Sequence, residues 1–325
     1  MPFVTDILGP RRPVTDLAPS LDPGRLRRTS TIDTHPGVPG ESIADLRGRD
    51  AVGTEDGIAV LGEVRIGARL VDFVVDEIES TPPDDRLDML RGHRVSRGFR
   101  AKLTELLRDE VCKSSLIHLL LDDWVGAALV SGYALAHAAI VLGVEQTMPP
   151  GVADRMAGIC AGFAPEASLV DYARRHDVIP TGRGPLAPPL DGLHAVAPLR
   201  QRGMRRFRRL DAWPVDDGLV EFDAHFRDSH LDDDLVETIL HEYTVTGRVD
   251  ERTRTVTSAH ADVRVLPWQE CPGAIGSAAR IAGMTLTELR DRVRGEFVGT
   301  STCTHLNDTL RTIADLDALL NLSTR

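Results

Sequence analysis

The sequence lacks an uninterrupted hydrophobic run that could cross a membrane, which takes about eighteen or more apolar residues. The longest candidate, residues 125–144, is interrupted by Gly126, Ser131, Gly132 and His137. A secretory pattern is also lacking, since Arg11 and Arg12 are followed by a proline-rich polar segment. We therefore expect a cytoplasmic protein without a membrane partner.

Two catalytic motifs are missing as well. No glycine-rich loop has the spacing of a phosphate cradle, and no Gly-x-Ser-x-Gly motif occurs, which argues against nucleotide-dependent and serine-hydrolase chemistry. The net charge is -11 and the pI is near 5.5, which argues against nucleic acid as the main partner. The arginine-rich segment 200–209 is a local exception that we interpret as a strand with one solvated face.

Cysteine is scarce, and four cysteines in a cytosolic chain indicate thiols or metal ligands rather than disulfides. With 325 residues, 42% hydrophobic and 27% charged, the chain is globular and long enough for two domains. Composition and periodicity predict four parts: a flexible arm (1–24), an N-terminal α+β half (25–147), a helical and Pro/Gly-rich connector (148–200) and a C-terminal α+β half (201–325).

Two sequence patterns occur in both halves. The segment Arg205 to Asp211 is similar to Arg27 to Asp33, and Leu286 to Asp291 aligns with Leu103 to Asp109 across one gap. We interpret these as a diverged internal duplication. The expected fold is α+β, with two related halves that each form an antiparallel sheet covered on one face by helices. Residues 34–56 are interpreted as a Gly/Pro-rich connection.

Two cysteines are predicted to lie at helix N-termini. Cys271 follows an apolar-alternating strand and precedes Pro272, which suits the first helical position. The hydroxyls of Thr300 to Thr302 are potential caps, so Cys303 and His305 fall in the first turn of another helix. Backbone N–H groups and the helix dipole favour a thiolate at such positions.

Strand alternation predicts which histidines point inward. His241 shares its strand face with apolar Tyr243 and Val245, so it is expected between the sheet and the helices. His225 and His260 alternate with apolar residues and are expected in solvent.

Together these features predict a metal site of His241, Cys271, Cys303 and His305, with donor atoms about 4 Å apart or less. Sulfur and nitrogen ligands suit zinc first, with iron as the alternative. In the first half the positions of Cys303 and His305 fall near residues 113–115, so only the second half keeps the ligands. The competing interpretation is ordinary packing, because buried cysteines are commonly small core residues.

Three motifs resemble a bacterial family known as domain of unknown function 2889. They are Leu266-Pro-Trp-x-x-Cys-Pro-Gly-Ala274, Cys303-Thr-His-Leu-x-Asp308 and the preceding His241-Glu-Tyr243. Segments 27–33 and 122–123 extend the similarity. The resemblance implies a role beside enzymes that degrade aromatic and other recalcitrant compounds, because members tend to be encoded among such enzymes.

The chain departs from the usual pattern at one position, since short members of that family carry two adjacent histidines where this chain has His241-Glu242. The C-terminal half is also similar, more distantly, to the iron–sulfur cluster scaffold fold in its order of strands, cysteine and final helix. The Cys-x-Asp of that scaffold has no counterpart here.

The leading hypothesis is a metal-dependent enzyme of hydrolase or lyase type that acts on a small organic substrate, with the metal as Lewis acid or water activator. Glu242, Tyr243 and Asp308 are the candidate acid, base or hydrogen-bond partners of the ligands. One alternative is a metal or iron–sulfur carrier, and another is a cysteine-nucleophile enzyme that uses Cys303. A homo-oligomer is left open.

Overall fold

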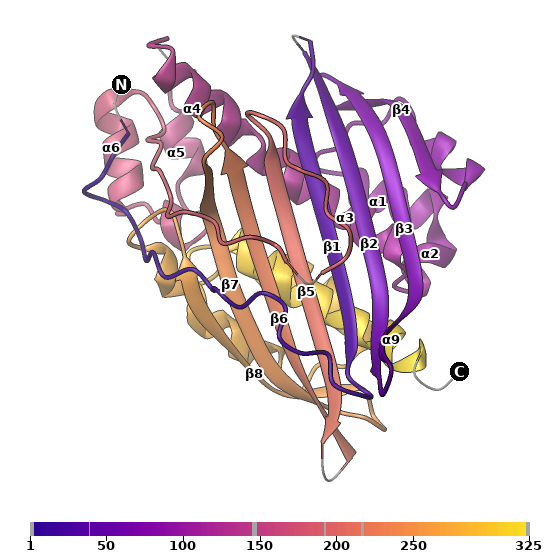
Figure 1. Ribbon diagram of the computed structural model, residues 1–325. Coiled ribbons are helices and arrows are strands. Elements are labelled where there is room, and N and C mark those ends of the chain that lie inside the picture. Colours follow the sequence, from indigo (N-terminus) through magenta and orange to yellow (C-terminus); the bar gives the residue numbers. More distant parts are fainter. Residues whose placement is uncertain (1–2, 39, 145–147, 192, 216–217, 323–325) are drawn as a thin grey trace.

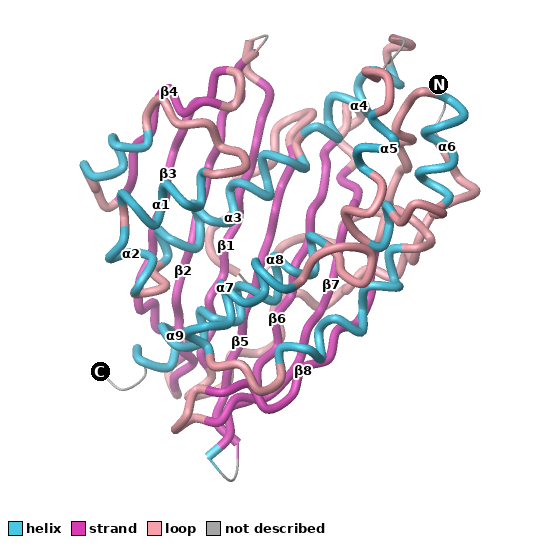
Figure 2. The backbone as a smooth tube through the Cα atoms, turned by 180° about the vertical axis from the view of Figure 1, so that it is seen from behind, coloured by secondary structure: helices cyan, strands magenta, loops and turns pink. Residues whose placement is uncertain are grey.

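The strands form one continuous antiparallel sheet. The computed structural model describes residues 3–38, 40–144, 148–191, 193–215 and 218–322, so the expected boundary at residue 147 lies outside the described residues. Within that part the strand order is β4-β3-β2-β1-β5-β6-β7-β8 (Figure 1). The helices lie on one face of the sheet (Figure 2). The expected α+β class, with antiparallel strands covered by helices, is confirmed.

Each half contributes a four-stranded meander, and the two meanders meet where β1 pairs antiparallel with β5. The strand order is therefore the same in both halves, counted outward from this central pair. The strands are β1 (Leu26–Pro36), β2 (Glu41–Thr54), β3 (Gly57–Val71), β4 (Val74–Thr81), β5 (Met204–Val215), β6 (Leu219–Leu231), β7 (Glu237–Asp250) and β8 (Thr255–Val265).

The helices follow each meander, with a shorter group in the connector. They are α1 (Phe99–Leu106), α2 (Arg108–Cys112), α3 (Leu116–Val130), α4 (Gly132–Val141), α5 (Val152–Met156), α6 (Ser168–His176), α7 (Leu286–Glu296), α8 (Thr304–Thr312) and α9 (Leu316–Leu322), with 3-10 segments η1 (Asp85–Leu90), η2 (Ala161–Phe163), η4 (Cys271–Ile281) and η5 (Ile313–Asp315).

Helices α3 and α4 together, Leu116–Val141, are long and apolar enough by length and composition to cross a membrane. This pair of helices is a candidate by overall composition, although polar residues such as Ser131 and His137 interrupt its apolar run as expected. The α3 side chains from Leu119 to Ala128 are buried, and α3 contacts β1, β2 and β5. Its hydrophobicity is therefore that of a core helix, whereas α4 carries the exposed Leu135 and Val141.

Strand β2 was not predicted, because residues 34–56 were interpreted as a connection. Its buried positions alternate through Ala44, Leu46, Gly48 and Asp50, and only one of these four, Leu46, has a large apolar side chain. A Cβ at Gly48 would lie 3.2 Å from Leu116 of α3. The close approach of α3 therefore requires small residues on this strand, and these weaken the sequence signal.

The arginine-rich strand β5 has no solvated face, which corrects the prediction. Arg205, Arg206, Arg208 and Arg209 are all buried, and each donates hydrogen bonds to at least one aspartate. Desolvating a guanidinium is costly unless it is paired with a hydrogen-bonded anion. The alternation of arginine with apolar residues on this strand therefore indicates buried ion pairs.

Reciprocal ion pairs join the two halves at the centre of the sheet. Arg27 of β1 donates two hydrogen bonds to Asp211 of β5, at 2.6 and 2.7 Å. Arg205 of β5 donates two to Asp33 of β1, both at 2.7 Å. The segments whose sequences resemble each other are thus direct partners across the β1–β5 junction.

The arm and the connector cover the sheet face that carries no helices (Figure 1). The arm is held by backbone hydrogen bonds, such as Val4 N–H to Thr181 O at 3.1 Å. This cover corrects the prediction for His225, which is buried and lies 2.9 Å from the Glu242 carboxylate through its Nε2. The sequence showed that His225 is on the face opposite the helices, but not that this face is covered.

We predict that Asp211→Asn lowers the free energy of unfolding by about 3 kcal/mol or more, because it leaves the buried Arg27 guanidinium without its counter-charge. Urea denaturation measures the change. Glu221→Gln is the matched control: its partner Arg248 is half-exposed, and an exposed pair contributes about 1 kcal/mol or less. Equal losses in the two variants would contradict a special role for the junction.

Candidate functional site

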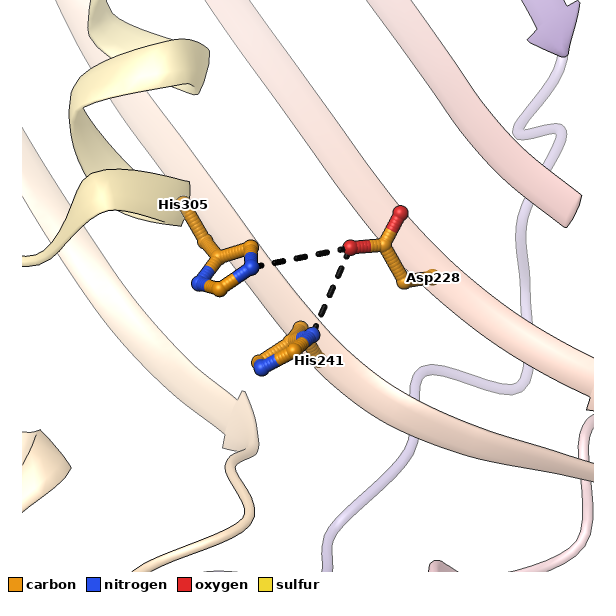
Figure 3. Close-up of side chains that lie close together, drawn as sticks. All are labelled: Asp228, His241 and His305. Carbon is orange, nitrogen blue, oxygen red and sulfur yellow. Dashed lines mark ion pairs between the residues drawn. The ribbon is translucent and has the colours of Figure 1, made fainter. Parts of the chain in front are cut away.

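Asp228, His241 and His305 converge on the helix-covered face of the second half (Figure 3). Asp228 on β6 and His241 on β7 are direct cross-strand partners, and a β-bulge follows them. His305 comes from the first turn of α8. The Asp228 Oδ2 atom lies 3.3 Å from His241 Nδ1 and 4.0 Å from His305 Nε2. Candidate ligand atoms of all three residues lie within 4.8 Å of one another.

A single guanidinium fixes the Asp228 carboxylate. Arg206 donates from Nε to Oδ1 at 2.8 Å and from Nη2 to Oδ2 at 3.0 Å. Its Nη1 also lies 3.1 Å from Asp123 and 3.2 Å from Asp308. Burial opposes ionisation of Asp228, but the charge of Arg206 and the adjacent His241 outweigh it and hold the pKa of Asp228 well below its usual range. The carboxylate is therefore anionic at neutral pH.

The two histidine rings are stacked, with centroids 3.6 Å apart and planes inclined by 18°. Burial, and then the neighbouring His241, lower the pKa of His305 well below its ordinary value. His305 is consequently neutral, which is the form that binds metal. The Nδ1 of His241 is buried without a well-aligned hydrogen bond, although Asp228 is close.

Two imidazoles and one carboxylate form a donor set that suits zinc or non-haem iron and leaves coordination positions open. Bonds of about 2.0–2.2 Å place donors roughly 4 Å apart or less, so adjustments of under about 1 Å would bring these atoms to an ion. Each carboxylate oxygen has two lone pairs, so Asp228 can accept from Arg206 and still bind a cation. The residues therefore fit a metal ion.

A cavity of about 620 Å³ adjoins this group. All four sequence-predicted ligands, His241, Cys271, Cys303 and His305, line it. The rest of its wall is mainly apolar and includes residues of the arm, α4, η2 and the segment that follows β8. The four residues that the sequence analysis grouped as ligands thus lie along the wall of one cavity.

Cys271 begins η4 as predicted, whereas Cys303 is the N-cap of α8 rather than a residue of its first turn, and the hydroxyls of Thr300 to Thr302 do not cap this helix. The Cys303 sulfur lies 3.9 Å from His305 Nδ1. Among the described residues, the group close enough to hold an ion includes neither sulfur. Burial raises the pKa of both thiols, so the expected thiolate is not favoured in this environment: desolvation outweighs the helix N-terminus.

The three predicted catalytic side chains lie in different places. Glu242 is on the opposite sheet face, where it accepts from Arg227 at 2.7 Å and from the Val14 N–H at 2.9 Å. Its proposed role at the site is therefore wrong, because adjacent strand residues point to opposite faces. Asp308 accepts a hydrogen bond from Arg311 at 2.6 Å, and its carboxylate lies 3.2 Å from Arg206 Nη1. It is not among the residues that line the cavity.

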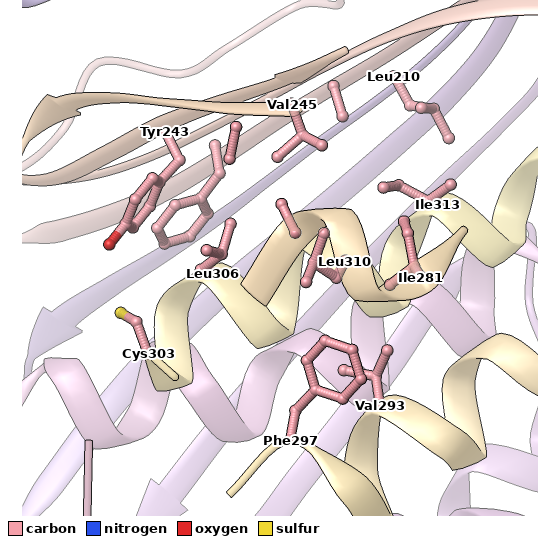
Figure 4. Close-up of a cluster of buried hydrophobic side chains, with 14 of the residues drawn as sticks. Leu210, Tyr243, Val245, Ile281, Val293, Phe297, Cys303, Leu306, Leu310 and Ile313 are labelled. Carbon is pink, nitrogen blue, oxygen red and sulfur yellow. The ribbon is translucent and has the colours of Figure 1, made fainter. Parts of the chain in front are cut away.

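Tyr243 is the predicted catalytic residue that stays near the site. Its hydroxyl points toward the Cys303 sulfur within the apolar core (Figure 4). Burial, together with the neighbouring cysteines, raises the pKa of Tyr243 well above 10. The phenol is therefore neutral and belongs to the same core cluster as Leu306. In this position Tyr243 is better suited to packing beside Cys303 than to transferring a proton.

Sequence reasoning missed Asp228, although a signal was present. The apolar residues of β6 alternate through Ala224 and Phe226, and the next residue in phase is Asp228. A carboxylate on an otherwise apolar face indicates a buried, paired charge. Extending the alternation by one more position would have placed Asp228 on the helix-covered face, although its place beside His241 follows only from the pairing of β6 with β7.

One family model matches part of the chain. Residues 204–318 match the model of a family described as "Protein of unknown function (DUF2889)". This range contains the strands β5 to β8 and the helical segments η4, α7 and α8. It therefore includes Asp228, His241 and His305. No curated protein and no solved structure matches the chain.

We predict that Cys112 reacts with iodoacetamide much faster than the other three cysteines near neutral pH. Cys112 is exposed, whereas Cys160, Cys271 and Cys303 are buried. Burial raises the Cys160 pKa from 9.0 to about 11, and two units reduce the thiolate fraction roughly a hundredfold. Mass spectrometry of timed samples identifies the modified cysteines. Fast alkylation of Cys303 in a Cys112→Ser background would show instead that Cys303 is an activated nucleophile.

Proposed function

We propose that this protein is a metal-dependent enzyme that acts on a small organic molecule, with Asp228, His241 and His305 as the metal ligands. The observation that carries the proposal is the position of these side chains: an ionised carboxylate and two histidines meet beside a cavity of about 620 Å³ that both histidines line. Zinc is the first choice and iron the alternative.

The comparison of the two halves supports this assignment. Arg28 donates to Asp50 across β1 and β2 as Arg206 donates to Asp228 across β5 and β6, and a β-bulge follows each aspartate. The β3 partner of Asp50 is Gly62, whereas the β7 partner of Asp228 is His241. We propose that a duplicated unit kept its ion pair in both halves and its ligands only in the second.

The surrounding residues have definable roles. Arg206 orients the Asp228 carboxylate, and such partners usually affect metal affinity strongly. The apolar wall excludes water from the cavity and strengthens electrostatic interactions inside it. A bound metal would supply Lewis-acid polarisation or an activated water, which suits hydrolase or lyase chemistry. A cytoplasmic location and a role in the catabolism of aromatic or other recalcitrant compounds are part of this proposal.

Elemental analysis tests the metal site. The full chain, grown with zinc and iron supplied and purified without chelator, should contain about one metal ion per chain. His305→Ala and Asp228→Asn should each lose most of it. His260→Ala is the control, because that side chain is 75% exposed, and its metal content should be unchanged.

A content below about a tenth of an ion per chain would remove the metal from the proposal. Circular dichroism of each variant separates loss of a ligand from loss of the fold. If His305→Ala is folded and keeps its metal, the ligand assignment is wrong.

A cysteine-nucleophile enzyme is the second candidate, favoured by the 3.9 Å distance between Cys303 Sγ and His305 Nδ1. The raised pKa of Cys303 counts against it. Cys303→Ser would abolish the activity of such an enzyme, and chelators would not affect it. A metal or iron–sulfur carrier would instead release its metal to an acceptor and show no turnover.

A further inference from the structure

The wall of the cavity is mainly apolar. Among the described residues that line it, none is an aspartate or a glutamate, although the chain contains 49 acidic residues. Besides the two histidines, the ionisable nitrogen groups on the wall belong to Arg11 and Arg183. In a protein of net charge -11, this is a local environment that favours a negative ligand.

The two arginines differ in their partners. Arg183 forms an ion pair with the buried Asp232 and lies over the Phe3 ring, 5.6 Å from its centroid. Arg11 donates from Nη1 to the Arg183 carbonyl at 2.7 Å, and none of the ion pairs between described residues includes it. The Arg11 guanidinium can therefore bind an anion, because the Arg183 carbonyl is uncharged and accepts from only one of the five N–H donors of Arg11.

The backbone around Arg11 is fixed even though its side chain is exposed. The neighbouring Arg12 N–H donates to Arg264 O at 2.8 Å, and the Leu266 N–H donates to Pro10 O at 3.0 Å. Arg11 itself forms an antiparallel bridge with Val265. The arm thus holds this guanidinium at the cavity beside the end of β8.

We infer that the cavity binds an amphipathic monoanion, whose apolar body fills the pocket and whose carboxylate is bound by Arg11. The inference rests on the proposed function, since it takes the cavity as the substrate site and names the substrate class. A planar guanidinium matches a carboxylate with two parallel hydrogen bonds. A volume of about 620 Å³ lies within the range of small-molecule sites, roughly 300–1,000 Å³.

A matched pair of probes tests this: dodecanoate and dodecan-1-ol, which share the alkyl chain and differ in charge. Titration calorimetry gives the dissociation constants, and Trp268, which lines the cavity, reports binding by fluorescence. The wild-type protein should bind dodecanoate at least about tenfold more tightly, as expected for a charge-assisted hydrogen bond. Arg11→Gln should remove this preference and leave dodecan-1-ol binding unchanged.

Arg12→Gln is the control, because Arg12 is adjacent, exposed and absent from the cavity wall. It should keep the preference for dodecanoate. Equal affinity of the wild-type protein for both probes would overturn the inference. Equal loss of the preference in Arg11→Gln and Arg12→Gln would also overturn it, since that pattern indicates only a long-range charge effect.

Repeating the titrations after removal of metal with EDTA separates this inference from the proposed function. A preference that persists without metal and disappears in Arg11→Gln supports the inference, even if the purified protein contains no metal and the metal-dependent function fails. A preference that disappears with EDTA and is unaffected by Arg11→Gln would assign the anion to the metal. That outcome would overturn the role of Arg11 while leaving the metal site intact.

Discussion

The buried guanidinium of Arg206 joins the candidate metal site to helices of both halves. Arg206 on β5 holds both oxygens of Asp228 on β6, and its remaining nitrogen lies between Asp123 of α3 and Asp308 of α8. A Cβ at Gly126 would come within 2.0 Å of Arg206, so α3 reaches it only through a glycine. The carboxylate of the candidate metal site is thus fixed by the same group that binds a helix from each half.

This arrangement explains why so many charges lie inside the protein. A buried arginine or aspartate alone would be strongly destabilising, and the pairs are tolerated because each member satisfies several others. Replacing such a network with apolar residues often leaves stability unchanged or higher. A functional use fits its presence here: the network holds an ionised Asp228 at a defined position beside His241 and the neutral His305.

The sequence allowed prediction of features that depend on local patterns. Strand alternation placed His241 inward, and Pro272 and the polar residues before Cys303 indicated that both cysteines lie near helix starts. It failed where distant segments decide the environment. His225 was expected in solvent because nothing local shows that the arm covers its face, and Asp228 was overlooked because its neighbours are set by pairing between β6 and β7.

The cover of the sheet also affects the order in which the site can be assembled. Residues 4–12 of the arm bond with segments near Thr181 and Arg264 to Gln269, so part of the cavity wall joins chain segments far apart in sequence. During synthesis the arm emerges early and has no binding partner until these later segments follow. A chaperone or a neighbouring chain can contact it during that interval. The cavity can therefore be completed only after synthesis has proceeded past His305, the last described residue of its wall.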